Sequence, residues 1–288
     1  MYDLSQYAFI ATIFALSLAV LLYFINAIGA RGLRMLSFAG GGASSTSTLD
    51  TAVAVGGRYA TILTVNAAAF LTASLVFRAI ASGHGPFSNM YEFSLGFSWG
   101  ALILYLYFEV RYRLRTRALV VLPIALGMLV YATTLPSEIR PLVPALQNDL
   151  WLTVHVAVAI LAYGAFTLAF GAAVLFLIQA RDNIRWLPRR AVLDEMAYRA
   201  VMVGFPMMAL VIILGAVWAQ IAWGTYWSWD PKETASLVTW LIYGGYLHAR
   251  VVRGWRGQRS ALLLIIGFGA TLFTYFGNYF LGGLHSYA

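Results

Sequence analysis

Eight long apolar runs dominate this sequence and leave little room for a soluble fold. Each extends for about 20 residues, the length that an α-helix needs to cross the hydrocarbon core of a bilayer. Because lipid offers no hydrogen-bond partners, each spanning segment must satisfy its own backbone groups, and we expect helices. The predicted spans are residues 7–29, 59–81, 91–110, 118–135, 151–180, 197–222, 231–250 and 260–281.

The whole chain, residues 1–288, is therefore predicted to be one all-α polytopic membrane domain, since 61% of its residues are hydrophobic and only 10% are charged. The first run has no basic segment before it and no small-residue cleavage site after it, which favours a retained span over a signal peptide. Residues 37–57 contain three consecutive glycines and a Ser/Thr tract, which predict a flexible loop between the first two spans.

Basic residues predict the orientation of the chain. Sixteen of the 19 Lys and Arg residues fall in the loops after the first, third, fifth and seventh spans. By the positive-inside rule these loops are cytoplasmic, and an even number of spans then places both termini outside. The net charge of +8 is explained by this distribution, so no nucleic-acid partner is implied.

Cysteine is absent from the chain. This excludes a disulfide framework, a thiolate metal site and a thiol relay within the chain, so any thiol chemistry must come from a client or partner.

The Trp-rich segment, residues 218–233, reads WAQIAWGTYWSWDPKE and follows the sixth span on the predicted outer side. Trp227 and Trp229 lie two residues apart beyond a glycine, which does not suit a helical face and favours an irregular or re-entrant platform. Flat rings on such a platform suit a flat, apolar ligand. The alternative is an interfacial aromatic belt, which any membrane protein can have. Asp230, Pro231 and Glu233 match the positions of a capping box that begins the next helix.

Four histidines are candidate ligands, because a histidine in so apolar a chain needs a partner. His84, His155 and His285 fall on the same predicted outer side as the Trp-rich segment. His248 lies 18 residues beyond Asp230, about 27 Å along a helix, and hence in the inner half of the membrane. For each histidine taken alone, an interfacial or hydrogen-bonded role is the alternative.

Haem is a ligand that fits a platform flanked by two imidazoles, since it is flat, largely apolar and takes axial ligands on both faces of its iron. If His155 and His285 are that axial pair, their ligating nitrogens must come within about 4 Å of each other. A dry aromatic wall would then keep water and oxygen from the iron.

The sequence resembles the CcsA/ResC family of cytochrome c biogenesis proteins, part of the haem-handling superfamily named for its Trp-rich WWD domain. The resemblance covers nearly the whole chain after the first span. It is carried by the eight spans, the run WGTYWSWDPKET from Trp223 to Thr234, Thr239 and Trp240, the YLH of Tyr246–His248, the loop residues His84, Pro86, Asn89, Tyr91 and Glu92, and the C-terminal Gly283, Leu284 and His285.

This resemblance implies a subunit of the system II cytochrome c synthase, whose lyase activity belongs to a complex with a CcsB/ResB partner. It implies that haem b, bound non-covalently, is held for attachment to the CxxCH motif of apocytochrome c, with thiol-reducing relay proteins acting alongside. By position, His155 and His285 match the outer axial pair, and His248 matches the intramembrane ligand of haem in transit. The residues that match the platform are Trp223, Tyr226, Trp227, Trp229 and Asp230. The implied location is a bacterial plasma membrane or a thylakoid membrane.

Three other classes remain open. A system I haem-delivery protein typically has six spans and an Arg-Leu after W-D-A, whereas this chain has Pro231, Lys232 and Glu233 at that point. A transporter would use the break at Gly224 to line a substrate site. A dihaem membrane cytochrome would need histidine pairs at two depths. Where the family usually has a further Trp, this sequence has Ala235, and this exchange could loosen the edge of the platform or alter how the client docks.

Overall fold

The computed structural model describes the whole chain except residues 39–42, 113–117, 180–181, 185–186, 278–279 and 286–288. Within these described residues the secondary structure is helical, with eight α-helices and one short 3₁₀ turn at Pro144–Leu146. The α-helices are α1 Tyr2–Phe38, α2 Ala43–Ser82, α3 Met90–Tyr112, α4 Ala118–Ala132, α5 Asp149–Ile178, α6 Arg190–Trp223, α7 Pro231–Val252 and α8 Gln258–Phe276.

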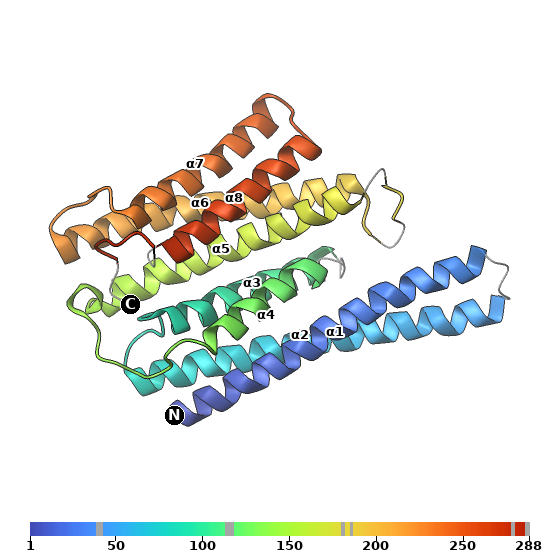
Figure 1. Cartoon of the computed structure of the whole chain (residues 1–288), viewed down its shortest axis with the longest axis horizontal. Helices are drawn as coiled ribbons and strands as arrows, with labels where there is room; N and C mark the ends of the chain where they lie inside the picture. The colour runs from blue at the N-terminus through green and yellow to red at the C-terminus, as the bar shows by residue number, and fades with distance from the viewer. Residues whose placement is uncertain (39–42, 113–117, 180–181, 185–186, 278–279, 286–288) are drawn as a thin grey trace.

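Successive helices run up and down the long axis of the molecule (Figure 1). The connections after α2, α4 and α6, which are residues 83–89, 133–148 and 224–230, therefore gather at one end of the bundle. We call this the loop end. The N-terminus lies at the same end, on the left in Figure 1, and α8 also runs toward it. Segments far apart in the sequence thus come together at the loop end.

The polytopic all-helical architecture agrees with the sequence prediction. Six of the described helices are long and apolar enough to cross a membrane: α1, α2, α3, α5, α6 and α8. The predicted fourth span, α4, is apolar but has only 15 residues, which is short for the hydrocarbon core. The predicted seventh span, α7, has 22 residues but carries Lys232 and Glu233 in its first turn and Arg250 in its last turns. Which end of the bundle faces the cytoplasm stays a prediction.

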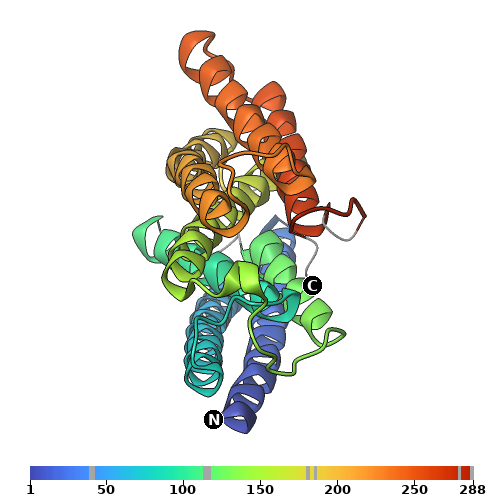
Figure 2. The same ribbon diagram turned by 90° about the vertical axis from the view of Figure 1, so that its left-hand side faces the viewer.

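Helix α5 holds the centre of the molecule and packs against α3, α4, α6 and α8. The pair α1 and α2 lies on one side of this centre, and α6, α7 and α8 lie on the other (Figure 2). Close approach of α3 and α5 depends on small residues: a Cβ on Gly164 would lie 2.8 Å from the Gly100 carbonyl, and one on Gly100 would lie 2.7 Å from the Ile160 carbonyl. These contacts position α5 so that its turns near the loop end can face α6 and α8.

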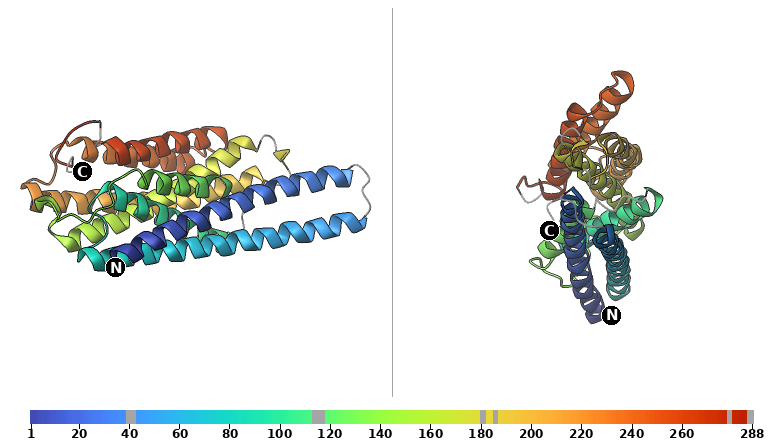
Figure 3. Two further views of the ribbon diagram at one scale, coloured as in Figure 1. Left: turned by 60° about the horizontal axis from the view of Figure 1, so that its bottom comes forward. Right: turned by 90° about the vertical axis from the view of Figure 1, so that its right-hand side faces the viewer.

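The flexible loop expected over residues 37–57 is not what the structure shows. Helix α1 continues to Phe38 and α2 already begins at Ala43, so residues 43–57 are helical, while 39–42 lie outside the described residues. The two helices extend past the rest of the bundle at the end away from the N-terminus (Figure 3). Gly and Ser lower helix propensity by about 1 kcal/mol or less per residue, so this composition disfavours a helix only weakly.

Two buried ion pairs fix helices at opposite ends of the bundle. Near the loop end, Arg78 of α2 donates from Nε to Glu92 of α3 over 2.6 Å, and the Glu92 carboxylate also accepts from the Ser88 backbone. Asn89 caps the beginning of α3, because the Glu92 backbone N–H donates to Asn89 Oδ1. At the other end, Arg250 of α7 pairs with Asp194 of α6 over 2.8 Å.

Candidate ligand-binding pocket

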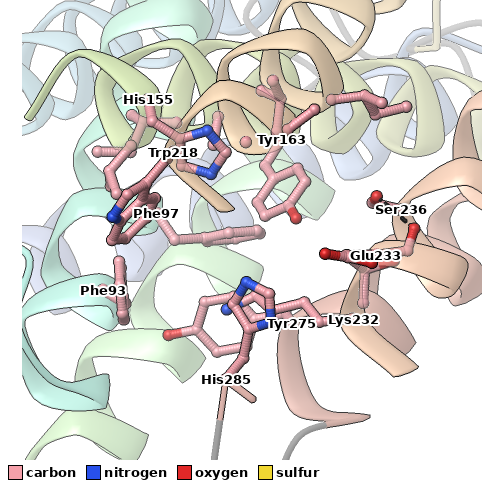
Figure 4. A pocket seen from close by; sticks show the side chains of 18 of the residues that line it. Phe93, Phe97, His155, Tyr163, Trp218, Lys232, Glu233, Ser236, Tyr275 and His285 are labelled. Atoms are coloured by element: carbon pink, nitrogen blue, oxygen red, sulfur yellow. Dashed lines mark hydrogen bonds between the residues drawn. The ribbon is translucent and has the colours of Figure 1, made fainter. Parts of the chain in front are cut away.

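A pocket lies at the loop end of the bundle, where α3, α5, α6, α7 and α8 converge (Figure 4). The empty space between its walls, including solvent at the open mouth, is about 1020 Å³. The walls are mostly aromatic and aliphatic, and the polar groups are few. The lining side chains with polar or aromatic character are Phe93, Phe97, His155, Tyr163, Trp218, Trp227, Lys232, Glu233, Ser236, Thr274, Tyr275 and His285.

His155 enters the pocket from the second turn of α5. Its ring packs edge-on against Trp218 of α6, with the ring centroids 5.5 Å apart, and Trp218 is fixed by donating its indole N–H to the Ala145 carbonyl. Gly215 of α6 makes room for the imidazole, because a Cβ there would lie 3.1 Å from His155 Cε1. His155 Nδ1 is buried and has no hydrogen-bond partner among the described residues. The Val211 backbone also lies near this ring. A buried imidazole nitrogen without a well-formed hydrogen bond is available to a ligand.

His285 reaches the same pocket from the C-terminal segment. Helix α8 ends at Phe276, five residues before the predicted end of the eighth span, and the following residues return toward the beginning of α7. Leu284 donates its backbone N–H to Asp230 Oδ2 over 2.7 Å, and His285 Nδ1 lies 2.8 Å from Asp230 Oδ1. The chain can approach this closely only because residue 283 is glycine: a Cβ on Gly283 would collide with Asp230 Oδ2.

Asp230 therefore has two structural tasks at once. The predicted capping box is confirmed, since Asp230 caps α7 at the Lys232 N–H and Glu233 accepts from the Asp230 N–H. The second task, holding the C-terminal segment, was missed by sequence reasoning because residues 284 and 285 are more than 50 positions away. Burial alone would raise the pKa of Asp230, but the backbone hydrogen bond from Lys232, the adjacent His285 and the Leu284 N–H together lower it.

The electrostatic setting favours a neutral imidazole at His285. Burial lowers the pKa of His285, and the nearby Lys232 charge acts in the same direction, while Asp230 opposes both. Only 15% of the His285 side chain is exposed, and Trp223 packs against it edge-on with centroids 4.8 Å apart. Because Asp230 engages Nδ1, ligation of a metal by this ring would use Nε2. A hydrogen-bonded carboxylate behind a histidine ligand fixes the ring and makes it more basic toward a metal.

The Trp-rich segment does not form one continuous platform. Helix α6 continues through Trp218 to Trp223 and stops at Gly224, which has φ of +76° and is the expected helix breaker. Trp227 lines the pocket, whereas Tyr226 and Trp229 are 61% and 70% exposed and do not. Trp229 is also held at φ of +59°, unusual for a bulky side chain, and packs edge-on against Trp227. That Tyr226 and Trp229 contact a bound ligand stays a prediction.

The other two histidines lie elsewhere. His248 is exposed on α7, about three turns beyond Ser236, and is not among the lining residues. His84 is in the loop between α2 and α3, where its Nδ1 lies 2.8 Å from the Gly85 carbonyl.

Several lining residues had no distinguishing sequence signal. Phe93, Phe97, Tyr163 and Tyr275 belong to apolar spans in which aromatic residues are common, so nothing in their local pattern separates a pocket wall from a lipid-facing surface. Lys232 does have a distinguishing feature in the sequence, because it is the only lysine in the chain.

The arrangement suits a metal chelate better than a bare metal ion. Among the described residues there is no cluster of three or more His, Cys, Asp or Glu that could ligate an ion. The pocket instead offers two imidazoles that approach from opposite sides, with Phe97 and Tyr163 alongside the space between them (Figure 4). A planar chelate that supplies four equatorial nitrogens needs only such an axial pair, and the aromatic walls suit its flat faces.

Comparison with known proteins gives a consistent result. The family described as Cytochrome C assembly protein matches residues 87–285. The cytochrome c biogenesis protein CcsA of Guillardia theta is 38% identical over 252 aligned positions, covering 78% of this chain and 83% of that protein. CcsA of Synechococcus sp. (strain JA-3-3Ab) is 37% identical, covering 88% of this chain and 90% of the relative.

Among solved structures, the chain resembles the cytochrome c haem lyase CcmF with a TM-score of 0.61 and 19% identity. The match covers 93% of this chain and 46% of that one, so this chain spans less than half of the solved protein. At this level of identity the likeness concerns the fold.

Proposed function

Because this chain belongs to the Cytochrome C assembly protein family, we propose that it is the haem-handling subunit of a system II cytochrome c synthase. In this role it holds haem b non-covalently at the loop end and presents it for thioether attachment to apocytochrome c. Its relatives are named as cytochrome c biogenesis proteins, and the solved neighbour as a cytochrome c haem lyase.

One observation carries the proposal: His155 and His285, 130 positions apart in the sequence, line the same aromatic pocket. His155 presents a buried ring nitrogen without a partner in the described chain, and His285 is fixed by Asp230. Haem fits this donor set because its porphyrin supplies the remaining four ligands of the iron.

The side chains around the two histidines have separable tasks. Trp218 and Gly215 set the orientation of His155, and Asp230 and Trp223 set that of His285. The apolar walls exclude water, which protects ferrous iron, the state needed when a client thiol adds across a vinyl group of haem.

The sulfur atoms of that addition come from the client. With no cysteine in the chain, each C–S bond forms between a vinyl carbon of haem and a thiol of the CxxCH motif, and the thiol hydrogen goes to the other vinyl carbon. Relay proteins outside this chain keep those thiols reduced. The lyase activity belongs to the complex with a CcsB/ResB-type partner.

His248 is proposed to ligate haem in transit, with the second axial ligand supplied by the partner. Its side chain is exposed on α7 rather than buried in the bundle, which supports a ligand completed from outside the chain. The proposed location is a bacterial plasma membrane or a thylakoid membrane, with the pocket on the outer face, as the arginine distribution predicts.

Coexpression with the CcsB/ResB partner and an apocytochrome tests the proposal. We expect a Soret band in the purified complex and covalent haem in the cytochrome. His155→Ala and His285→Ala should each abolish maturation, with His84→Ala as a matched histidine control outside the pocket.

Other outcomes identify the rival classes. Absence of a Soret band from haem-replete cells, even with the partner present, favours a transporter. Haem binding with transfer to a chaperone and no thioether favours a delivery protein. Retention of a second haem at His248 in the isolated chain favours a dihaem cytochrome.

A further inference from the structure

Lys232 is the only lysine in the chain, and its side chain lines the pocket. All 18 other basic side chains are arginines. Lys232 is the second residue of α7, directly after the Asp230–Pro231 start of that helix. Figure 4 shows it reaching into the pocket beside His285 and Tyr275.

The ammonium group has no anionic partner within the part of the chain that the structure describes. None of the ion pairs found there, at 4.0 Å or less, includes Lys232. The ring of Phe93 lies near the ammonium group, with its centroid 5.6 Å from Nζ, at the outer limit of a cation–π contact.

The two carboxylates close to Lys232 in sequence are already engaged. Glu233 accepts from the Ser228 and Asp230 N–H groups over 2.9 and 3.3 Å. Asp230 accepts from the Lys232 and Leu284 N–H groups and lies against His285. Both therefore serve the start of α7 and the C-terminal segment. The Asp230 charge acts on Lys232 from a distance, but neither carboxylate forms an ion pair with its ammonium group.

An ammonium group among apolar and aromatic walls is costly unless an anion accompanies it. An anionic group on the ligand of the pocket would compensate this charge. A carboxylate on a flexible arm is the group that a lysine can pair with as a point charge, without the fixed planar geometry that arginine demands.

We propose that Lys232 binds a propionate carboxylate of the haem held by His155 and His285. This inference rests on the proposed function and adds a subsite to it: the two imidazoles bind the iron, and Lys232 selects and orients the acidic edge of the ring. With one propionate fixed at the first turn of α7, rotation of the porphyrin about the axis between the imidazoles is restricted, and the vinyl groups keep one position.

The test compares haem with its dimethyl ester, which has the same ring and iron but no carboxylates. The full-length chain in detergent is titrated with each porphyrin and the Soret shift is followed. The wild type should prefer haem over the diester. Lys232→Met should weaken haem binding by about 10- to 100-fold, the effect of one charge-assisted hydrogen bond, and leave diester binding nearly unchanged.

Two further variants isolate the charge at this position. Lys232→Arg should retain a preference for haem. Arg140→Gln removes one positive charge from an exposed side chain at the loop end, outside the pocket, and should leave the preference intact. A general effect of net charge would reduce the preference for haem in Arg140→Gln as much as in Lys232→Met.

A second measurement needs no substitution, because the chain offers a single ε-amino group for chemical labelling. Haem should slow the modification of Lys232 by an amine-reactive reagent, as measured by mass spectrometry of its peptide, and the diester should protect less. Equal preference for haem and diester in the wild type, or equal protection by both, would overturn the role of Lys232 while leaving the haem site intact. Failure of the wild type to bind either porphyrin would overturn the proposed function and this inference with it.

Discussion

Asp230→Ser separates the two tasks of Asp230. Serine is a good N-cap and preserves the start of α7. Its single, shorter oxygen cannot also hold Leu284 and His285, which the wild-type carboxylate does over 2.7 and 2.8 Å. A role in capping alone, as the local sequence suggests, predicts that even Asp230→Ala costs only about 1 kcal/mol.

The structure predicts a larger effect on ligand binding than on folding. Both lost contacts involve a charged group, and only 2% of the Asp230 side chain is exposed, so solvent does little to weaken them. At about 1.5–3 kcal/mol for each such hydrogen bond, their loss removes about 3–6 kcal/mol that holds the C-terminal segment. At 1.4 kcal/mol per tenfold change, the lower value corresponds to about 100-fold weaker haem binding.

Haem titration and thermal unfolding of the same detergent samples provide the measurement. Asp230→Ser should have a midpoint near that of the wild type but bind haem about as poorly as His285→Ala. Asp230→Ala should bind haem equally poorly and also be less stable. If Asp230→Ser bound haem with wild-type affinity and only Asp230→Ala were defective, capping would be the sole role of Asp230. This result would refute the idea that Asp230 holds His285 in position.

Three other predictions use the same site. Gly283→Ala should displace the C-terminal segment and weaken haem binding, because its Cβ meets the Asp230 carboxylate. The matched control is Gly282→Ala, whose Cβ meets nothing within 4 Å. Equal loss of haem affinity in the two variants would contradict this geometry. His155→Ala and His285→Ala should regain part of their cytochrome maturation with added imidazole, whereas normal maturation in the double variant would rule out axial pairing. Burial lowers the pKa of His285 below its usual 6.5, so a proton competes with iron for this ring only in more acidic solution. The Soret band should therefore persist as the pH falls through 6.5. Loss of the band above pH 6.5 would contradict the lowered pKa of His285.

The lowered pKa of Asp230 likewise determines how its contribution to stability changes with pH. Its pKa is lowered in the folded chain, so the stability contributed by the ionised carboxylate is present above pH 3.8 and is lost as pH falls through the lowered value. Neutral and mildly acidic buffers are thus suitable for the comparisons above.

Local pattern was sufficient for much of the fold. Helix α3 begins one residue before its predicted start, and α7 begins at the predicted residue, because Asn89 and Asp230 are caps whose partners lie within four positions. Gly224 ends α6 for an equally local reason, its φ of +76°. Residues 43–57 were predicted poorly, since a Gly- and Ser-rich composition disfavours a helix only weakly.

By itself, the sequence determined the all-helical membrane-spanning architecture, the caps of its helices and the residue types from which a haem site can be made, because these depend on hydrophobicity and on neighbours a few positions apart. Only the tertiary structure decided that α8 stops at Phe276 and the chain returns to Asp230, that Gly215 leaves room for His155, and that the side chains of Tyr226 and Trp229 are exposed. The physical reason is that hydrogen bonds and close contacts between residues more than 50 positions apart leave no periodic trace in the sequence and exist only once the helices have packed.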